Sequence, residues 1–133
     1  MSGCNPMRWD CEVQGCFNKK KRPKIEVFAD CLPGKCCFGD VDAIAEINGR
    51  GLFLEWKSTA GNVPMGQRIL HERLTKTGLL STIVVAGNAE TMEAHHMAKF
   101  FMGRWIDWEP ATLDDVKKAI TGWAKWAQGA QQP

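Results

Sequence analysis

The chain has 133 residues, of which 44% are hydrophobic and 24% charged, and it includes six tryptophans and six phenylalanines. This length suits one domain with its own core, and the composition excludes a chain that is disordered throughout. Seventeen basic and fifteen acidic residues give a net charge of +2. No apolar run approaches the roughly 20 residues of a membrane helix. We therefore expect no membrane contact and, without an apolar leader, a cytoplasmic protein.

Residues 1–22 are expected to form an irregular, basic arm that bears cysteines. Five basic side chains fall within six positions, and the other 12 basic and 15 acidic residues sum to −3. Such a run either contacts nucleic-acid phosphates or is a solvated loop, and both interpretations stay open. The run consists of Lys19, Lys20, Lys21, Arg22 and Lys24.

All six cysteines lie in the first third of the chain. Cys11 and Cys16 are separated by four residues, as are Cys31 and Cys36. Four thiolates are a ligand set for a structural Zn²⁺ ion. Because the gap is wider than the usual two-residue zinc knuckle, buried or free thiols are the alternative.

A short helix is predicted between Pro23 and Pro33-Gly34, where apolar residues have helical spacing. Residues 35–47 then alternate as in a strand. Asn48-Gly49 is a strong hairpin turn signal, and residues 50–57 are predicted to form the return strand.

After a polar loop, Pro64 is predicted to open a second helix that ends near Gly78. Gln67 and His71 share one face of this helix, and we expect His71 to be a structural histidine. Arg68 either contacts phosphate or belongs to a solvated face. The inner side is expected to carry Met65, Ile69, Leu70 and Leu74.

Residues 79–86 are predicted to form a buried strand. Residues 89–109 fit either a helix or a hairpin that turns at Met102-Gly103, and we favour the hairpin. A capping box at Thr112 and Asp115 predicts a final helix, so the whole is a mixed α/β layered fold. Its apolar stripe is Leu113, Val116, Ile120, Trp123 and Ala127. Trp105, Trp108, Trp123 and Trp126 are expected in the core or a dimer interface rather than stacked on bases.

The first hairpin carries the chemistry. With a two-residue turn at positions 48 and 49, paired residue numbers sum to 97. Asp42 then faces Glu55, and Asp40 faces Lys57 on the same side, while the other side is apolar. Opposed Cβ atoms lie about 4.5–5.5 Å apart, so the two carboxylates repel each other unless a cation joins them. Mg²⁺ or Mn²⁺ would relieve the repulsion and activate water toward a phosphodiester; a structural set of cross-strand ion pairs is the alternative.

Two runs in this hairpin resemble the PD-(D/E)xK nuclease superfamily, and in spacing they are most similar to small VRR-type nucleases and archaeal-type Holliday-junction resolvases. The runs are Val41-Asp42-Ala43-Ile44 and Leu52-Phe53-Leu54-Glu55-Trp56-Lys57-Ser58. The resemblance covers about residues 23–87 and departs from the family at Val41, where a non-catalytic proline is usual. It implies a restriction-endonuclease-like core of helix, β-hairpin, helix and strand, and a phage or bacterial source.

The resemblance also implies the roles of individual residues. Asp42 and Glu55 would bind the metal with the backbone carbonyl of Trp56, and Lys57 would orient the attacking water or stabilise negative charge. An acidic residue of the first helix and a glutamine of the second also match family positions. These are Glu26 and Gln67, and Asp40 is an additional candidate ligand.

Together these observations predict a metal-dependent DNA endonuclease, with branched DNA as the expected substrate and RNA not excluded. Symmetric cleavage of two strands requires two active sites, so a homodimer is expected. One domain, 1–133, would comprise the arm (1–22), the nuclease core (23–87) and a C-terminal extension (88–133). The alternative function is a zinc-stabilised module that binds nucleic acid or a host protein without cleavage, which the cysteines beside the basic run suggest.

Overall fold

The computed structural model describes residues 25–36, 38 and 41–129. The chain divides into two compact units, Met1–Gly39 and Asp40–Pro133. The division falls inside the core predicted for residues 23–87. In the first unit a 3₁₀ helix, η1, spans Ile25–Cys31, within the region where the sequence predicts a short helix.

The second unit contains a five-stranded mixed sheet and two α-helices, which confirms the predicted mixed α/β class. The strand order is β1-β2-β3-β4-β5, with β2 and β3 parallel and all other neighbours antiparallel. The elements are β1 (Ala43–Ile47), β2 (Arg50–Lys57), α2 (Met65–Thr75), β3 (Leu80–Asn88), β4 (Glu93–Phe101), β5 (Arg104–Pro110) and α3 (Leu113–Gly129). Among the helices that the structure describes, none is long and apolar enough to cross a membrane.

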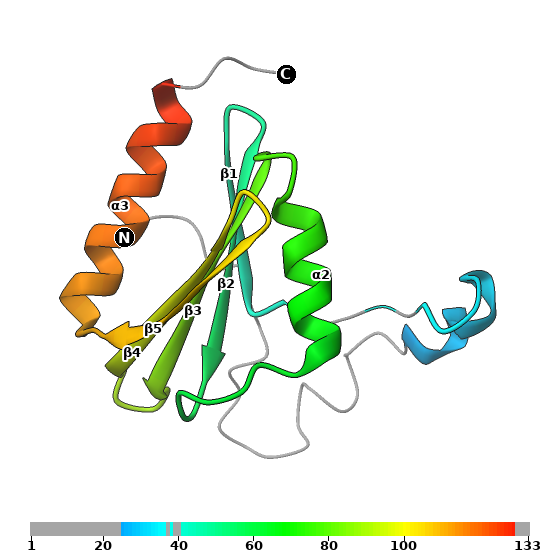
Figure 1. Ribbon diagram of the computed structural model, residues 1–133, viewed down its shortest axis with the longest axis horizontal. Coiled ribbons are helices and arrows are strands. Elements are labelled where there is room, and N and C mark those ends of the chain that lie inside the picture. The colour runs from blue at the N-terminus through cyan, green and yellow to red at the C-terminus, as the bar shows by residue number, and fades with distance from the viewer. Residues whose placement is uncertain (1–24, 37, 39–40, 130–133) are drawn as a thin grey trace. The chain divides into compact units, whose positions relative to one another are not determined.

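The two helices cover opposite faces of the sheet (Figure 1). Ile83 of β3 lies in the core cluster that includes Trp123 of α3. The next residue, Val84, lies in a second cluster with Phe100, whose ring stacks on His71 of α2. Since successive strand residues point to opposite faces, α2 and α3 pack against different sides of β3.

Both predicted hairpins are confirmed. Asn48 (φ 51°) and Gly49 (φ 81°) form the first turn, and Met102 (φ 54°) and Gly103 (φ 80°) form the second. Each turn has positive φ at both central residues, as two-residue turns of the primed type require. The second turn excludes the helical interpretation of residues 89–109. The first strand is shorter than predicted, because it begins at Ala43 and not at residue 35.

The prediction for the inner side of α2 is wrong. Met65 is 70% exposed, and Ile69, Leu70 and Leu74 are each more than one third exposed. The buried residues are His71 and Thr75. These polar side chains can face the sheet because each has a partner: His71 Nδ1 lies 2.9 Å from Thr82 Oγ1, and Thr75 Oγ1 donates to the His71 carbonyl. The helix also ends at Thr75, short of the predicted Gly78.

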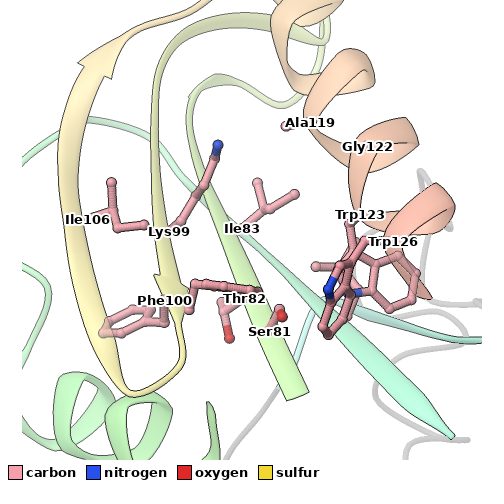
Figure 2. Close-up of a pocket in the computed structure, with 12 residues that line it drawn as sticks. Ser81, Thr82, Ile83, Lys99, Phe100, Ile106, Ala119, Gly122, Trp123 and Trp126 are labelled. Atoms are coloured by element: carbon pink, nitrogen blue, oxygen red, sulfur yellow. The ribbon is translucent and has the colours of Figure 1, made fainter. Parts of the chain in front are cut away.

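Helix α3 agrees with its prediction. The Thr112 amide donates to Asp115 Oδ2 (2.9 Å) and the Asp115 amide donates to Thr112 Oγ1 (3.2 Å), which is the predicted capping box. The Thr112 amide and the Thr112 hydroxyl (3.1 Å) both donate to the Asp115 carboxylate, and these two hydrogen bonds lower the pKa of Asp115. Val116, Trp123 and Ala127 of the predicted stripe are buried. Between α3 and the sheet lies a hollow of about 390 Å³, with Ser81 from β3, Lys99 from β4 and both indole rings of α3 on its walls (Figure 2).

The first turn is also joined to the end of α3. Asn48 Nδ2 donates to the carbonyls of Ala127 (3.3 Å) and Gln128 (3.1 Å). These carbonyls belong to the last turn of the helix, where intrahelical donors are lacking. Asn48 therefore serves two purposes, adopting the left-handed turn conformation and capping a helix that is about 80 residues away in the chain.

We expect Asn48→Gly to lower the free energy of unfolding by about 1 kcal/mol, because glycine keeps the turn but loses both capping hydrogen bonds. Asn48→Ala should lower the free energy of unfolding by roughly a further 1 kcal/mol, because alanine also disfavours positive φ. Urea unfolding of the three proteins measures both steps. A glycine variant as stable as the parent would show that the capping bonds contribute nothing.

Candidate active site

The observed strand register brings Asp42 next to Glu55. All five pairs between β1 and β2 have residue numbers that sum to 97, and the last is Ala43 with Leu54. One step further along the same register, Asp42 lies opposite Glu55. Asp42 is exposed, whereas only 8% of Glu55 is accessible to solvent. The predicted pairing of the two acids therefore agrees with the register of the hairpin.

The carboxylate of Asp42 contacts the backbone of the Glu55-Trp56-Lys57 motif. The Trp56 amide donates to Asp42 Oδ2 at 2.6 Å. The Gly51 amide donates to the carbonyl of Leu79, the residue before β3. Because backbone groups alternate in direction along a strand, odd-numbered residues of β2 direct their amides and carbonyls toward β3, and even-numbered residues direct theirs toward β1. The Trp56 amide points to the β1 side of β2, but β1 begins only at Ala43 and has no strand residue opposite Trp56. The Asp42 side chain accepts the hydrogen bond that a backbone carbonyl of β1 would otherwise accept.

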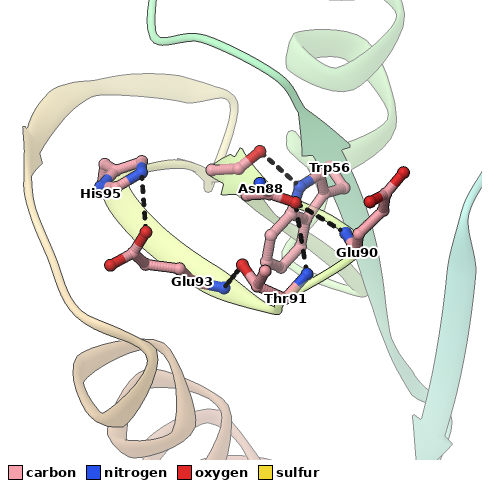
Figure 3. Close-up of polar contacts among 7 residues, drawn as sticks. Trp56, Asn88, Glu90, Thr91, Glu93 and His95 are labelled. Atoms are coloured by element: carbon pink, nitrogen blue, oxygen red, sulfur yellow. Dashed lines mark hydrogen bonds and ion pairs between the residues drawn. The ribbon is translucent and has the colours of Figure 1, made fainter.

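The side chain of Trp56 is fixed as well. Its indole Nε1 donates to the Gly87 carbonyl at 3.0 Å, at the end of β3 (Figure 3). The turn that follows is held by Asn88 Oδ1, which accepts hydrogen bonds from the amides of Glu90 and Thr91. The middle residue of the motif is thus held by its backbone on one side and by its ring on the other.

Lys57 and Gln67 are brought together, as the resemblance implies. Lys57 Nζ donates to Gln67 Oε1 at 2.8 Å in a partly buried hydrogen bond. Lys57 is the last residue of β2, and Gln67 lies in the first turn of α2, which follows after a short loop. The loop and helix therefore return the chain to the end of β2 and place a neutral acceptor beside the ammonium group.

His71 lies one helical turn after Gln67 and is a structural residue, as predicted. It is 3% exposed, its ring stacks on Phe100 with centroids 5.1 Å apart, and the edge of Phe53 approaches it at 5.9 Å. Burial lowers the pKa of His71 below its ordinary value of 6.5, and the nearby charge of Lys57 lowers the pKa further. The ring is therefore neutral at pH 7.

The donor set at the end of the hairpin fits a magnesium-like ion. No group of three or more His, Cys, Asp and Glu side chains gathers within residues 25–36, 38 and 41–129. A Mg²⁺ ion, however, commonly takes one or two carboxylates and keeps several waters. Asp42 and Glu55 supply two carboxylates, and strand geometry directs the Trp56 carbonyl to the β1 side of β2, as it does the Trp56 amide. A carboxylate that accepts one hydrogen bond still has lone pairs for a metal.

Several predicted residues lie outside the part of the chain that the structure describes. Asp40, the additional candidate ligand, and the side chain of Glu26 are among them. The same holds for the basic run (Lys19, Lys20, Lys21, Arg22 and Lys24) and for Cys11 and Cys16 as zinc ligands. Cys31 and Cys36 are described in the first unit, where both are exposed and free of disulfides. The zinc site stays a prediction.

Arg68 and two tryptophans form a second group of residues near the motif. The Arg68 guanidinium lies 5.6 Å from the ring centre of Trp105 and 3.7 Å from the carboxylate of Glu72. Trp105 contacts Trp108 edge to face at 5.9 Å, and Trp108 Nε1 donates to the Gly61 carbonyl at 2.8 Å. The sequence predicts these tryptophans in a core or interface and does not reveal that Trp108 is bonded to the loop after Lys57. No short motif announces such a contact.

Comparisons with known protein families, with curated proteins and with solved structures give no match. The resemblance to the nuclease superfamily therefore rests on the motif and on the geometry of these residues.

We expect the stability of the protein to fall as the pH drops below about 6.5, with a slope of up to about 1.4 kcal/mol per pH unit from His71. The unfolded chain protonates this histidine more readily than the folded protein does, so acid favours unfolding. Urea unfolding between pH 7.5 and 5 should show this slope in the parent and in His95→Gln, which changes an exposed histidine. His71→Gln should lose it, and an unchanged slope in that variant would contradict the assignment.

Proposed function

We propose that this protein is a metal-dependent endonuclease of the PD-(D/E)xK type that hydrolyses phosphodiester bonds in DNA. The observation that carries the proposal is the contact between the Asp42 carboxylate and the backbone of the Glu55-Trp56-Lys57 motif. This contact holds the Asp42 carboxylate beside the second acid and the backbone of the motif. A metal site built from two carboxylates and a strand carbonyl needs these groups close together.

In this proposal Asp42, Glu55 and the Trp56 carbonyl hold Mg²⁺ or Mn²⁺. The bound metal would supply charge for the phosphate oxygens and lower the pKa of a coordinated water. Lys57 donates hydrogen bonds to the attacking water or to a phosphate oxygen, and its position is set by Gln67. Glu55 is largely buried, so its carboxylate has less contact with bulk water than that of the exposed Asp42.

The substrate and the assembly follow from the resemblance and from the symmetry of cleavage. Branched DNA is the substrate suggested by the resemblance, and a homodimer is the assembly that symmetric cleavage of two strands requires. The carboxyl ends of the parallel strands β2 and β3, where the motif lies, are a common location for ligand sites in α/β sheets.

Replacing either acid should abolish cleavage. We expect Glu55→Gln and Asp42→Asn to lower the cleavage rate of plasmid and four-way-junction DNA more than about 100-fold in Mg²⁺ or Mn²⁺, because each amide lacks the charge that binds the metal. Glu46→Gln is the matched control, since Glu46 lies on the same face of β1 but bonds the Gly49 amide at the turn. Equal activity of the parent, Glu55→Gln and Asp42→Asn proteins would refute the proposal.

Removing the partner of Lys57 should weaken cleavage without abolishing it. We expect Gln67→Ala to lower kcat about 10- to 100-fold with a smaller change in KM, since a hydrogen bond to a charged group is lost and the ammonium is less well placed. Ile69→Ala, on the exposed side of the same helix, should leave both constants unchanged. If Gln67→Ala behaves like Ile69→Ala, Gln67 does not position the lysine.

A further inference from the structure

A hollow of about 270 Å³ lies directly beside the motif. It is lined by Lys57, by Trp108 and by the loop after Lys57, which contributes Ser58, Thr59, Gly61 and Pro64. The loop residues from Ser58 to Asn62 are mostly exposed, so the hollow opens to solvent next to the lysine. Pockets for drug-sized ligands measure roughly 300–1,000 Å³, so this one suits a single group of smaller size.

The lining of the hollow includes an aromatic side chain that is held in place. Trp108 is partly buried, and its Nε1 donates to the Gly61 carbonyl at 2.8 Å. Trp105 meets Trp108 edge to face, and Arg68 lies over Trp105. The hollow therefore has the indole ring of Trp108 and the side chain of Lys57 in its lining, with a second indole ring and the Arg68 guanidinium next to Trp108.

These features match one nucleotide, with a flat apolar base and an anionic phosphate. We propose that the hollow receives an unpaired base next to the phosphate that is cleaved, with the base against Trp108 and the phosphate toward Lys57. The inference rests on the proposed nuclease function and narrows its substrate. A base inside a duplex must first be unpaired and unstacked, which costs free energy, before it can enter a side pocket, so the preferred substrates are single strands, bulges and branch points.

The test compares three labelled DNAs of one sequence: a fully paired duplex, the same duplex with one bulged nucleotide, and the single strand. The parent protein in Mn²⁺ should cleave the bulged and single-stranded DNAs at least about tenfold faster than the duplex. Trp108→Ala should reduce that preference at least about fivefold, the lower end of what one base-aromatic stack contributes. Trp108→Phe keeps a stacking ring without the bond to Gly61, and it should retain most of the preference.

A binding measurement separates this inference from the proposed function. Fluorescence anisotropy measures the binding of labelled oligo-dT, oligo-U and paired DNA to two proteins. One is the Glu55→Gln variant, and the other carries both Glu55→Gln and Trp108→Ala. If Trp108→Ala weakens the binding of the unpaired strands and leaves the binding of paired DNA unchanged, the result supports the hollow as a base site. The comparison of oligo-dT with oligo-U tells whether the site prefers DNA or RNA. Trp126→Ala, an exposed tryptophan of α3 on the other side of the sheet, is the control and should change nothing.

Each result has a definite meaning. If Trp108→Ala cleaves and binds paired and unpaired DNA in the parent ratio, the base site is refuted while the nuclease stands. If the parent cleaves none of the three DNAs with either metal, the nuclease is refuted and the binding arm alone decides whether the hollow selects unpaired bases. If Trp108→Ala does not fold, Trp108→Leu removes the stacking ring while it keeps an apolar side chain larger than that of alanine, and a parent ratio in that variant refutes the site.

Discussion

The geometry of the candidate site depends on one tight turn. Asn48 and Gly49 both take positive φ values, and this allows two residues to reverse the chain. The turn length then fixes the register of every pair in the hairpin. A three-residue turn would shift one strand by one position, and Asp42 and Glu55 would no longer share a face. The hydrogen bonds from Asn48 to the end of α3 hold the turn against the body of the second unit, so the register is supported by contacts outside the hairpin.

The parallel pairing of β2 and β3 determines what else reaches the site. A parallel partner requires a crossover, and here the crossover consists of the loop after Lys57 and helix α2. The chain that leaves β2 therefore passes the end of the motif again at Gln67. One topological requirement thus supplies both the partner of the lysine and the loop that forms the neighbouring hollow.

The hairpins could be predicted from the sequence because they depend on local signals, namely Asn48-Gly49, Met102-Gly103 and the alternation of residues beside them. The start of β1 could not, because the alternation continues before Ala43, where the strand begins. The contact of Asp42 with the Trp56 amide follows from that early end of the ladder, and residue types alone do not reveal it. Side-chain positions that depend on the sheet surface, such as those of α2, were also beyond the sequence.

Helix α2 illustrates why hydrophobic periodicity failed there. Its apolar residues suggested an inner face, but the sheet below offers the hydroxyl of Thr82, and His71 bonds to it and stacks on Phe100. The helix is therefore rotated so that the row of Gln67, His71 and Thr75 faces the sheet.

This rotation has an electrostatic consequence for the site. Because His71 is buried, its pKa is lowered and its ring carries no charge beside Lys57. Gln67 accepts a hydrogen bond from Lys57 but adds no negative charge, as a glutamate at that position would. The neighbours contributed by α2 thus fix the position of the ammonium group and leave its charge in place. A fixed charge that its neighbours on α2 do not neutralise is what stabilisation of a phosphate at this end of the sheet requires.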